Sequence, residues 1–204
     1  MSAMERIVFA SGNPGKIREV QEILGDSRFK ILPQSDFAVP EAPETGLTFV
    51  ENAILKARNA AHHSGLPAIA DDSGLAVDWL DGAPGVHSAR YAGENADDGA
   101  NVQKLLAALD GVPERQRGAR FICVLVFLRH PADPCPLIAQ GVWEGSIMHS
   151  PQGAGGFGYD PVFWVHNHRC TAAQLPLAAK NGLSHRGQAL RALFQEFHYQ
   201  PLPV

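Results

Sequence analysis

The sequence predicts an α/β protein with a mixed β-sheet, and three observations lead to this fold class. Apolar runs typical of buried strands alternate with amphipathic helical segments in the first part of the chain. An unbroken apolar run over 121–128, rich in β-forming residues, indicates a central strand. A second strand-like stretch over 137–148 follows a proline-containing connection, which predicts a hairpin. Early alternation followed by a hairpin implies parallel and antiparallel pairs in one sheet.

The first strand and the first helix are joined by a turn with a capping pattern. Residues 7–10 form the apolar strand, Asn13 is placed as the N-cap, and Pro14 occupies the first helical position. The apolar spacing of the helix predicts that it buries one face and ends at Gly25. The residues on that face are Ile17, Val20 and Leu24.

Three further helices and a strand follow from similar signals. Thr48 and Glu51 form a capping box that starts a helix, which Gly65 stops. A strand resumes over 68–70, with the run 71–74, Asp-Asp-Ser-Gly, at or near its end. Residues 102–109 mark another amphipathic helix, and Ser184 caps the last one. The apolar positions of that last helix are Leu190, Leu193, Phe194 and Phe197.

Composition describes an ordinary soluble protein of one domain over residues 1–204. The net charge of −4 disfavours a duplex-binding protein, which usually carries a basic excess, so we expect no nucleic-acid partner. Three widely spaced cysteines give neither a disulfide framework nor a C-x-x-C metal pair. We expect no signal peptide and no membrane span, and therefore a cytoplasmic protein.

The turn before the first helix is a candidate phosphate site. Ser11, Gly12, Asn13, Pro14, Gly15 and Lys16 run from strand to helix. Helix N-termini attract phosphate, whereas a cation there is disfavoured by about 0.3–1 kcal/mol unless an anion is bound. The segment lacks the first glycine and the Ser/Thr of a P-loop. The alternative is a capped turn with a solvated lysine.

A second group of cations lies at the start of the last helix. His185 and Arg186 follow Ser184, and Lys180 lies just upstream. Cations at two helix N-termini suggest one polyanion held by both. The alternative is a basic surface patch.

Acidic residues suggest a metal carried with substrate phosphates. Asp71 and Asp72 lie near a strand end, and Glu41 and Glu44 lie in a loop. Oxygen ligands in small number suit Mg²⁺ bound together with phosphates. We interpret Glu41 as a solvated loop charge. The apolar flanks of Asp71 and Asp72 favour a buried catalytic role over a simple turn.

A glycine-rich segment over 153–161 could approach a ligand closely, and Phe157 within it could stack on a base. The alternative is a hairpin loop with one core aromatic. His166, His168 and Cys170 alternate as metal ligands on one strand face would. We interpret that cluster as incidental.

Taken together, these segments resemble the inosine/xanthosine triphosphate pyrophosphatase family. The resemblance covers nearly the whole chain in order and spacing. Beyond the segments above, it rests on 44–46, 49–57, 70–75, 84–91 and 180–187. Two flanks depart from the family pattern: His87 replaces an aromatic residue, and the stretch 175–179 lacks acidic residues. These departures leave the reaction unchanged and affect the ranking of substrates.

The resemblance implies an elongated mixed β-sheet with flanking helices, in two lobes around a central active-site cleft, and a homodimer. It implies Mg²⁺-dependent cleavage of non-standard purine triphosphates between the α- and β-phosphates. By the same resemblance, residues 11–16 hold phosphates, Glu44 and Asp72 bind metal, and Asp72 is the general base. Substrate contacts are implied for Ser73, Phe157, Gly158, Tyr159, Asp160, Lys180, His185 and Arg186.

The choice of purine follows from hydrogen bonding. Hypoxanthine and xanthine carry an acceptor at O6 where adenine carries an amine donor. Lys180, Arg186 and protonated His185 can only donate, so adenine would leave them unpaired. Two alternatives remain open: a pyrophosphatase for modified pyrimidine nucleotides, and a nucleotide sensor that does not cleave its ligand.

Overall fold

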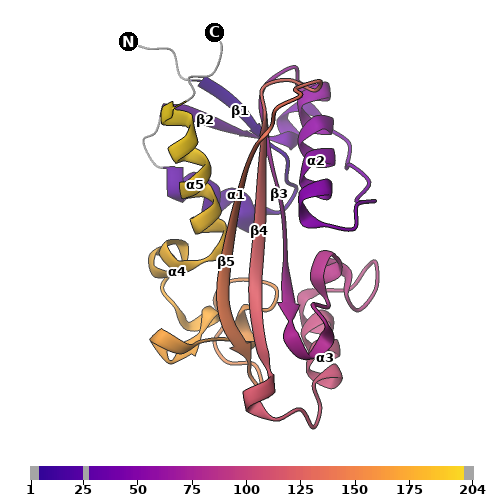
Figure 1. The fold of residues 1–204 in the computed structure, drawn as a ribbon, viewed down its shortest axis with the longest axis vertical. Helices are drawn as coiled ribbons and strands as arrows, with labels where there is room; N and C mark the ends of the chain where they lie inside the picture. The colour runs from indigo at the N-terminus through magenta and orange to yellow at the C-terminus, as the bar shows by residue number, and fades with distance from the viewer. Residues whose placement is uncertain (1–4, 25–27, 200–204) are drawn as a thin grey trace. The chain divides into compact units, whose positions relative to one another are not determined.

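The computed structural model of the chain describes residues 5–24 and 28–199, and its strands form one mixed sheet (Figure 1). The strand order is β2-β1-β3-β4-β5-β6-β7. β1 (Glu5–Phe9) pairs in parallel with β2 (Phe29–Pro33) and with β3 (Ala68–Val77). β4 (Gly118–Leu128) and β5 (Leu137–Ile147) follow, and β6 (Phe163–Val165) pairs antiparallel with β5 and β7 (Cys170–Thr171). The predicted fold class is confirmed.

The chain divides into two compact units, in keeping with the two lobes that the resemblance implies. The first contains the described residues within 1–72, 123–141 and 186–204, and the second contains 73–122 and 142–185. β3, β4 and β5 contribute residues to both units.

In the first unit, Figure 1 shows α1 (Pro14–Leu24) and α5 (His185–Tyr199) on one side of the strands and α2 (Phe49–Ser64) on the other. The core on the α1 and α5 side is apolar and aromatic, and Phe29 packs against both Phe194 and Phe197. α2 presents small side chains to the strands, with Ala53, Ala57, Ala60 and Ala61 fully buried. Burial of these faces stabilises the unit by removing apolar surface from water.

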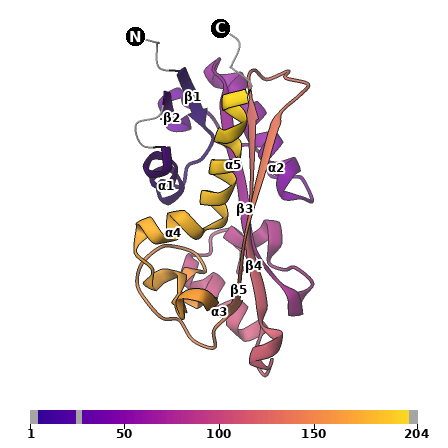
Figure 2. The ribbon, with the colours of Figure 1, turned by 60° about the vertical axis from the view of Figure 1, so that its left-hand side comes forward.

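The second unit has its own core, in which α3 (Asp98–Ala108) packs against the strands (Figure 2). Leu105 and Leu109 lie in this core with Leu75, Phe121 and Phe163. α4 (Leu177–Leu183) also belongs to this unit and leads into α5 after Ser184. No helix in the described part of the chain is long and apolar enough to cross a membrane.

Both predicted helix caps in the first unit are confirmed. The Asn13 side chain accepts hydrogen bonds from the N–H groups of Gly15 (2.8 Å) and Lys16 (3.2 Å). Thr48 and Glu51 form the capping box at the start of α2, and Gly65 ends that helix in a left-handed conformation (φ 67°). The predicted end of α1 at Gly25 lies outside the described residues.

One prediction about β3 is wrong. Residues 71–74 lie in the middle of this strand, which runs on to Val77, and not at its end. The burial that their apolar flanks indicated is confirmed, since the two aspartates are 1% and 5% exposed. The ion pairs described next offset the cost of burying their charges. β2, β6, β7 and α4 were not predicted.

Candidate active site

Asp72 lies at the centre of a cluster in the first unit that also contains Glu44, Lys56 and Asn52. Lys56 Nζ lies 2.6 Å from Asp72 Oδ1 and 3.0 Å from Glu44 Oε1. Asn52 Nδ2 donates to Asp72 Oδ2 at 3.4 Å. The structure therefore brings together the two carboxylates predicted to bind metal, and one ammonium contacts both of them.

The pKa values of Asp72 and Lys56 both differ from those of exposed side chains. Burial raises the pKa of Asp72 above its ordinary value, and the Lys56 ammonium offsets only part of this effect. Burial also opposes the charge of Lys56, but Asp71 and Asp72 together outweigh it and raise the pKa of Lys56. The cluster therefore holds a permanent cation beside a carboxylate that accepts a proton more readily than an exposed aspartate.

Asp71 points into a second ion-pair network, which contains Lys16, Arg186 and Glu19. Its Oδ2 lies 2.9 Å from Lys16 Nζ and 3.5 Å from Arg186 Nη2, and Arg186 Nη1 also pairs with Glu19. Burial opposes ionisation of Asp71, but Lys16 and Arg186 outweigh it and hold the pKa of Asp71 well below its usual range. Asp71 is therefore a counter-ion shared by two cations.

The ion pairs of Lys16 and Arg186 bear on the expectation that a polyanion binds at two helix N-termini. We inferred a bound polyanion because Lys16 and Arg186 lie in first turns, where cations are disfavoured. In the structure both cations have carboxylate partners from the protein itself. Their placement alone therefore does not require a ligand. Arg186 is only 2% exposed, whereas Lys16 is partly exposed.

The second unit contains the glycine-rich segment and Lys180, for which substrate contacts are predicted. Asp160 Oδ2 accepts from Lys180 Nζ at 2.7 Å and from the Phe157 backbone N–H at 2.9 Å. Lys180 Nζ also lies 4.8 Å from the centre of the Phe157 ring, a cation–π distance. The buried Asp160 thus joins a cation and an aromatic ring, two groups suited to a base.

Tyr159 and His185 pack into the same unit. The Tyr159 hydroxyl donates to the Ser88 carbonyl at 2.9 Å, and burial raises its pKa. The His185 ring stacks on Phe121 with centroids 4.8 Å apart. Ser73 is half-buried in β3, next to Asp72 in the chain. The substrate contacts assigned to these residues stay predictions.

Sequence reasoning assigned no role to Lys56, Asn52 and Glu19. A signal for the first two was present, because they are four residues apart and therefore share one face of α2. Polar residues on a face that is otherwise lined by alanines are candidates for a site. No comparable signal marked Glu19, whose partner Arg186 is 167 residues away.

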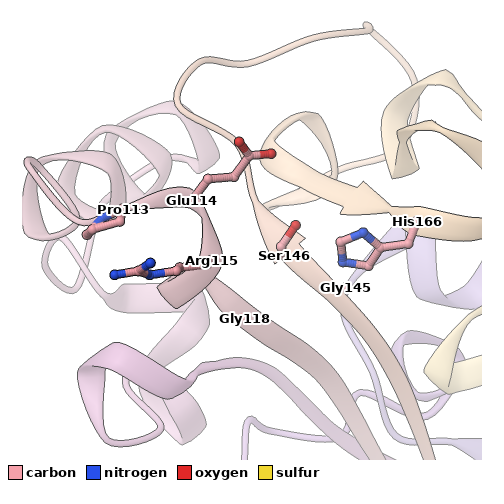
Figure 3. A pocket seen from close by; sticks show the side chains of 7 residues that line it. All are labelled: Pro113, Glu114, Arg115, Gly118, Gly145, Ser146 and His166. Carbon is pink, nitrogen blue, oxygen red and sulfur yellow. The ribbon is translucent and has the colours of Figure 1, made fainter.

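Other candidates are less well supported. Glu41 is exposed, in agreement with a solvated loop charge. Within 5–24 and 28–199, no group of three or more His, Cys, Asp or Glu side chains is placed to hold a metal ion. His166 and His168 lie in a 3-10 helix and Cys170 in β7, so the three do not alternate along one strand. A hollow in the second unit (Figure 3) contains none of the predicted site residues. It is lined by Pro113, Glu114, Arg115, Gly118, Gly145, Ser146 and His166.

Comparison with known proteins gives matches over nearly the whole chain. A sequence model of the Ham1 family matches residues 7–196. The dITP/XTP pyrophosphatase of Vibrio cholerae is 57% identical over 197 residues, which cover 97% of this chain and 98% of that protein. A HAM1 protein from Coxiella burnetii has a similar structure, with a TM-score of 0.89 and 52% identity over 96% of this chain and all of that one. The nucleoside-triphosphatase / dITP/XTP pyrophosphatase of Mycobacterium abscessus gives a TM-score of 0.72 and 44% identity over 92% of this chain and 97% of that one.

Proposed function

Because the chain belongs to the Ham1 family, we propose that it hydrolyses the non-standard purine nucleotides ITP, dITP and XTP to the monophosphate and pyrophosphate. Removing these nucleotides keeps them out of DNA and RNA. The observation that carries the proposal is the Asp72 cluster, since a buried carboxylate with a raised pKa is what water activation needs. A protein that only binds nucleotide has no use for such a base.

Asp72 acts as the general base in this proposal. Lys56 and Asn52 bind its two oxygens and so fix the orientation of the carboxylate. In that orientation it accepts a proton from a water molecule aimed at the α-phosphorus. Lys56 remains charged during the proton transfer, because its pKa is raised. It therefore helps to offset the charge on the reacting phosphates.

The donor set of the Asp72 cluster fits Mg²⁺. This ion is usually bound by one or two carboxylates together with substrate phosphates. Glu44 and Asp72 supply two carboxylates whose oxygens both face one cation, the Lys56 ammonium. We propose that these two residues hold Mg²⁺. When bound, the ion supplies charge neutralisation for the leaving pyrophosphate.

The turn over 11–16 binds phosphate in this proposal. Asn13 caps α1, and Lys16 extends from the first turn to Asp71 with part of its surface open. A phosphate that contacts Lys16 would share this ammonium with Asp71. The N-terminus of α1 adds a partial positive charge.

We propose that the second unit supplies contacts to the base and ribose. Phe157 stacks on the base, and Lys180 and His185 donate to acceptors on the purine and sugar. Asp160 keeps Lys180 against the Phe157 ring. Arg186, at the start of α5 in the first unit, adds a donor that O6 of hypoxanthine or xanthine accepts. Adenine carries a donor at that position and leaves Arg186 unmatched.

The assembly and cellular location belong to the proposal as well. We propose a homodimer in the cytoplasm without a nucleic-acid partner. The net charge of −4 supports the last point, because binding to a phosphate backbone depends on basic residues. The full-length resemblance to the family supports the dimer.

The product analysis tests the function. ITP incubated with the purified protein and Mg²⁺ should yield IMP and pyrophosphate, and chromatography should show no IDP. IDP with orthophosphate would contradict attack at the α-phosphorus. Faster turnover of dTTP or UTP than of ITP would favour a pyrimidine pyrophosphatase, and binding without turnover would favour a sensor.

A further inference from the structure

Two consecutive backbone N–H groups in the glycine-rich segment each donate to a carboxylate. The Phe157 N–H donates to Asp160 Oδ2, three residues away, at 2.9 Å. The Gly158 N–H donates to Asp98 Oδ2 at 2.7 Å, and Asp98 lies 60 residues earlier in the chain. Hydrogen bonds to a charged acceptor are stronger than those between neutral groups. Asp98, which lies outside the glycine-rich segment, therefore holds the backbone of that segment at Gly158.

The backbone around Phe157 needs such a contact. Gly156 and Gly158 both adopt left-handed conformations, with φ of 72° and 62°. Glycine in the unfolded chain samples many other conformations, so holding these two costs conformational entropy. The Gly158 bond to Asp98 fixes the residue that follows Phe157, and Asp160 fixes Phe157 itself. Together the two carboxylates hold the backbone of Phe157 and of the residue that follows it.

The local structure of α3 does not need Asp98 for its own cap. Asp97 is the N-cap residue, and its side chain accepts from the Ala100 N–H at 2.7 Å. Asp98 is the first residue of the helix and is exposed, so it does not contribute to the core. Its side chain accepts the hydrogen bond from the Gly158 N–H. Asp97 therefore caps α3, whereas Asp98 binds the backbone of the glycine-rich segment.

We propose that Asp98 is a positioning residue for purine recognition. Through the Gly158 N–H it holds the Phe157 ring where the ring stacks on the base. This inference rests on the proposed function, in which Phe157 contacts the purine. Asp98 itself touches no substrate, so its removal affects binding of the base more than the chemical step.

Three variants test the inference by ITP hydrolysis. Asp98→Ala removes the acceptor and should raise KM for ITP by about tenfold, with kcat within about twofold of wild type. Asp98→Asn keeps an acceptor without the charge and should restore most of the affinity. Asp97→Ala is the matched control: it removes the helix cap, so it should lower the melting temperature while leaving KM unchanged.

A second measurement does not depend on activity. Hydrogen exchange of the Gly158 amide, followed by NMR without nucleotide, should be faster in Asp98→Ala than in wild type or Asp97→Ala. An unchanged KM or an unchanged exchange rate in Asp98→Ala would overturn the inference, as would equal effects of the two alanine variants. A wild-type protein that hydrolyses no ITP would instead overturn the proposed function.

Discussion

Lys16 Nζ lies 2.9 Å from Asp71 Oδ2, which places the lysine of the first helical turn on a buried carboxylate of the neighbouring strand. The same oxygen lies 3.5 Å from Arg186 Nη2. Two cations that we assign to opposite ends of a nucleotide, phosphate and base, therefore share one counter-ion. The three residues are far apart in sequence, so only the fold brings them together.

Replacing Asp72 tests the assignment of the general base. Asp72→Asn keeps the shape of the side chain but removes the charge, so kcat should fall by at least about 10². The fold should persist, because Lys56 still pairs with Glu44 and the variant no longer buries the carboxylate charge, which burial disfavours at Asp72. Steady-state kinetics with ITP at saturating Mg²⁺ measure the effect. Turnover close to wild type would show that the base is another group.

Replacing Arg186 tests whether this residue makes the protein prefer ITP to ATP. Arg186→Ala should reduce kcat/KM for ITP by a factor that corresponds to about 1–3 kcal/mol, and should change kcat/KM for ATP little. The ratio between the two substrates therefore shrinks. Equal losses for both substrates that exceed the loss of folded protein would identify Arg186 as a phosphate contact.

The same variant also carries a stability cost, because it leaves Glu19 and Asp71 without this buried partner. Breaking a buried ion pair costs about 3–5 kcal/mol. The ratio of the two kcat/KM values is the safe measurement here, since a lower folded fraction scales both substrates equally. Thermal unfolding of Arg186→Ala checks the stability loss separately.

Asp133 gives a prediction on pH. It accepts hydrogen bonds from Arg129 Nε at 2.8 Å and from the N–H groups of Arg129 and Cys135 at 3.0 and 3.1 Å. These bonds, the one with the Arg129 side chain above all, hold the pKa of Asp133 well below its usual range.

A carboxyl with a depressed folded pKa stabilises the protein above its unfolded pKa of about 3.9, and this contribution is lost as the pH falls below that value. The difference in unfolding free energy between wild type and Asp133→Asn should therefore be constant near neutral pH and shrink below about pH 4. Denaturant titrations at pH 7, 4 and 3 measure it. A difference that does not change with pH would contradict the ion pair.

Replacing Arg117 should change the stability of the fold, and we assign this residue no part in catalysis. This buried guanidinium donates to the carbonyls of Leu109 (2.7 Å), Ile147 (2.7 Å) and Met148 (2.9 Å). Arg117→Met leaves these acceptors without a charged donor and should lower the unfolding free energy by about 3 kcal/mol or more. The exposed Arg115 is the control, and Arg115→Met should change stability by less than about 0.5 kcal/mol. Similar losses in both variants would refute a specific role for Arg117.

The sequence predicted the features that depend on local chemistry. Asn13 and Thr48 were identified as helix caps because each cap bonds to a residue only three positions further along the chain. The central strand over 121–128 followed from an apolar run. Asp72 and Glu44 were placed in one site by resemblance, and the structure brings both to Lys56.

Features that depend on distant partners were not predictable in this way. The prediction that Asp71 and Asp72 lie at or near a strand end was wrong, because two adjacent carboxylates can be buried inside a strand only with ion-pair partners from elsewhere in the chain. Their partners Lys16, Lys56 and Arg186 lie in three separate segments, and no local pattern shows which cation pairs with which aspartate. Short elements such as β7, with two residues, have no periodicity to detect. The hydrogen bond between Gly158 and Asp98 likewise joins residues that are 60 positions apart.

The lysine between Glu44 and Asp72 also has a consequence for handling the protein. Since the Lys56 ammonium already compensates two adjacent carboxylates, their mutual repulsion does not depend on a divalent ion for relief. Chelation with EDTA should therefore stop turnover without unfolding the chain, and adding Mg²⁺ back should restore activity at once. If Glu44 and Asp72 hold Mg²⁺ as proposed, a shortage of magnesium would stop catalysis only for as long as it lasts, because the fold does not depend on the ion.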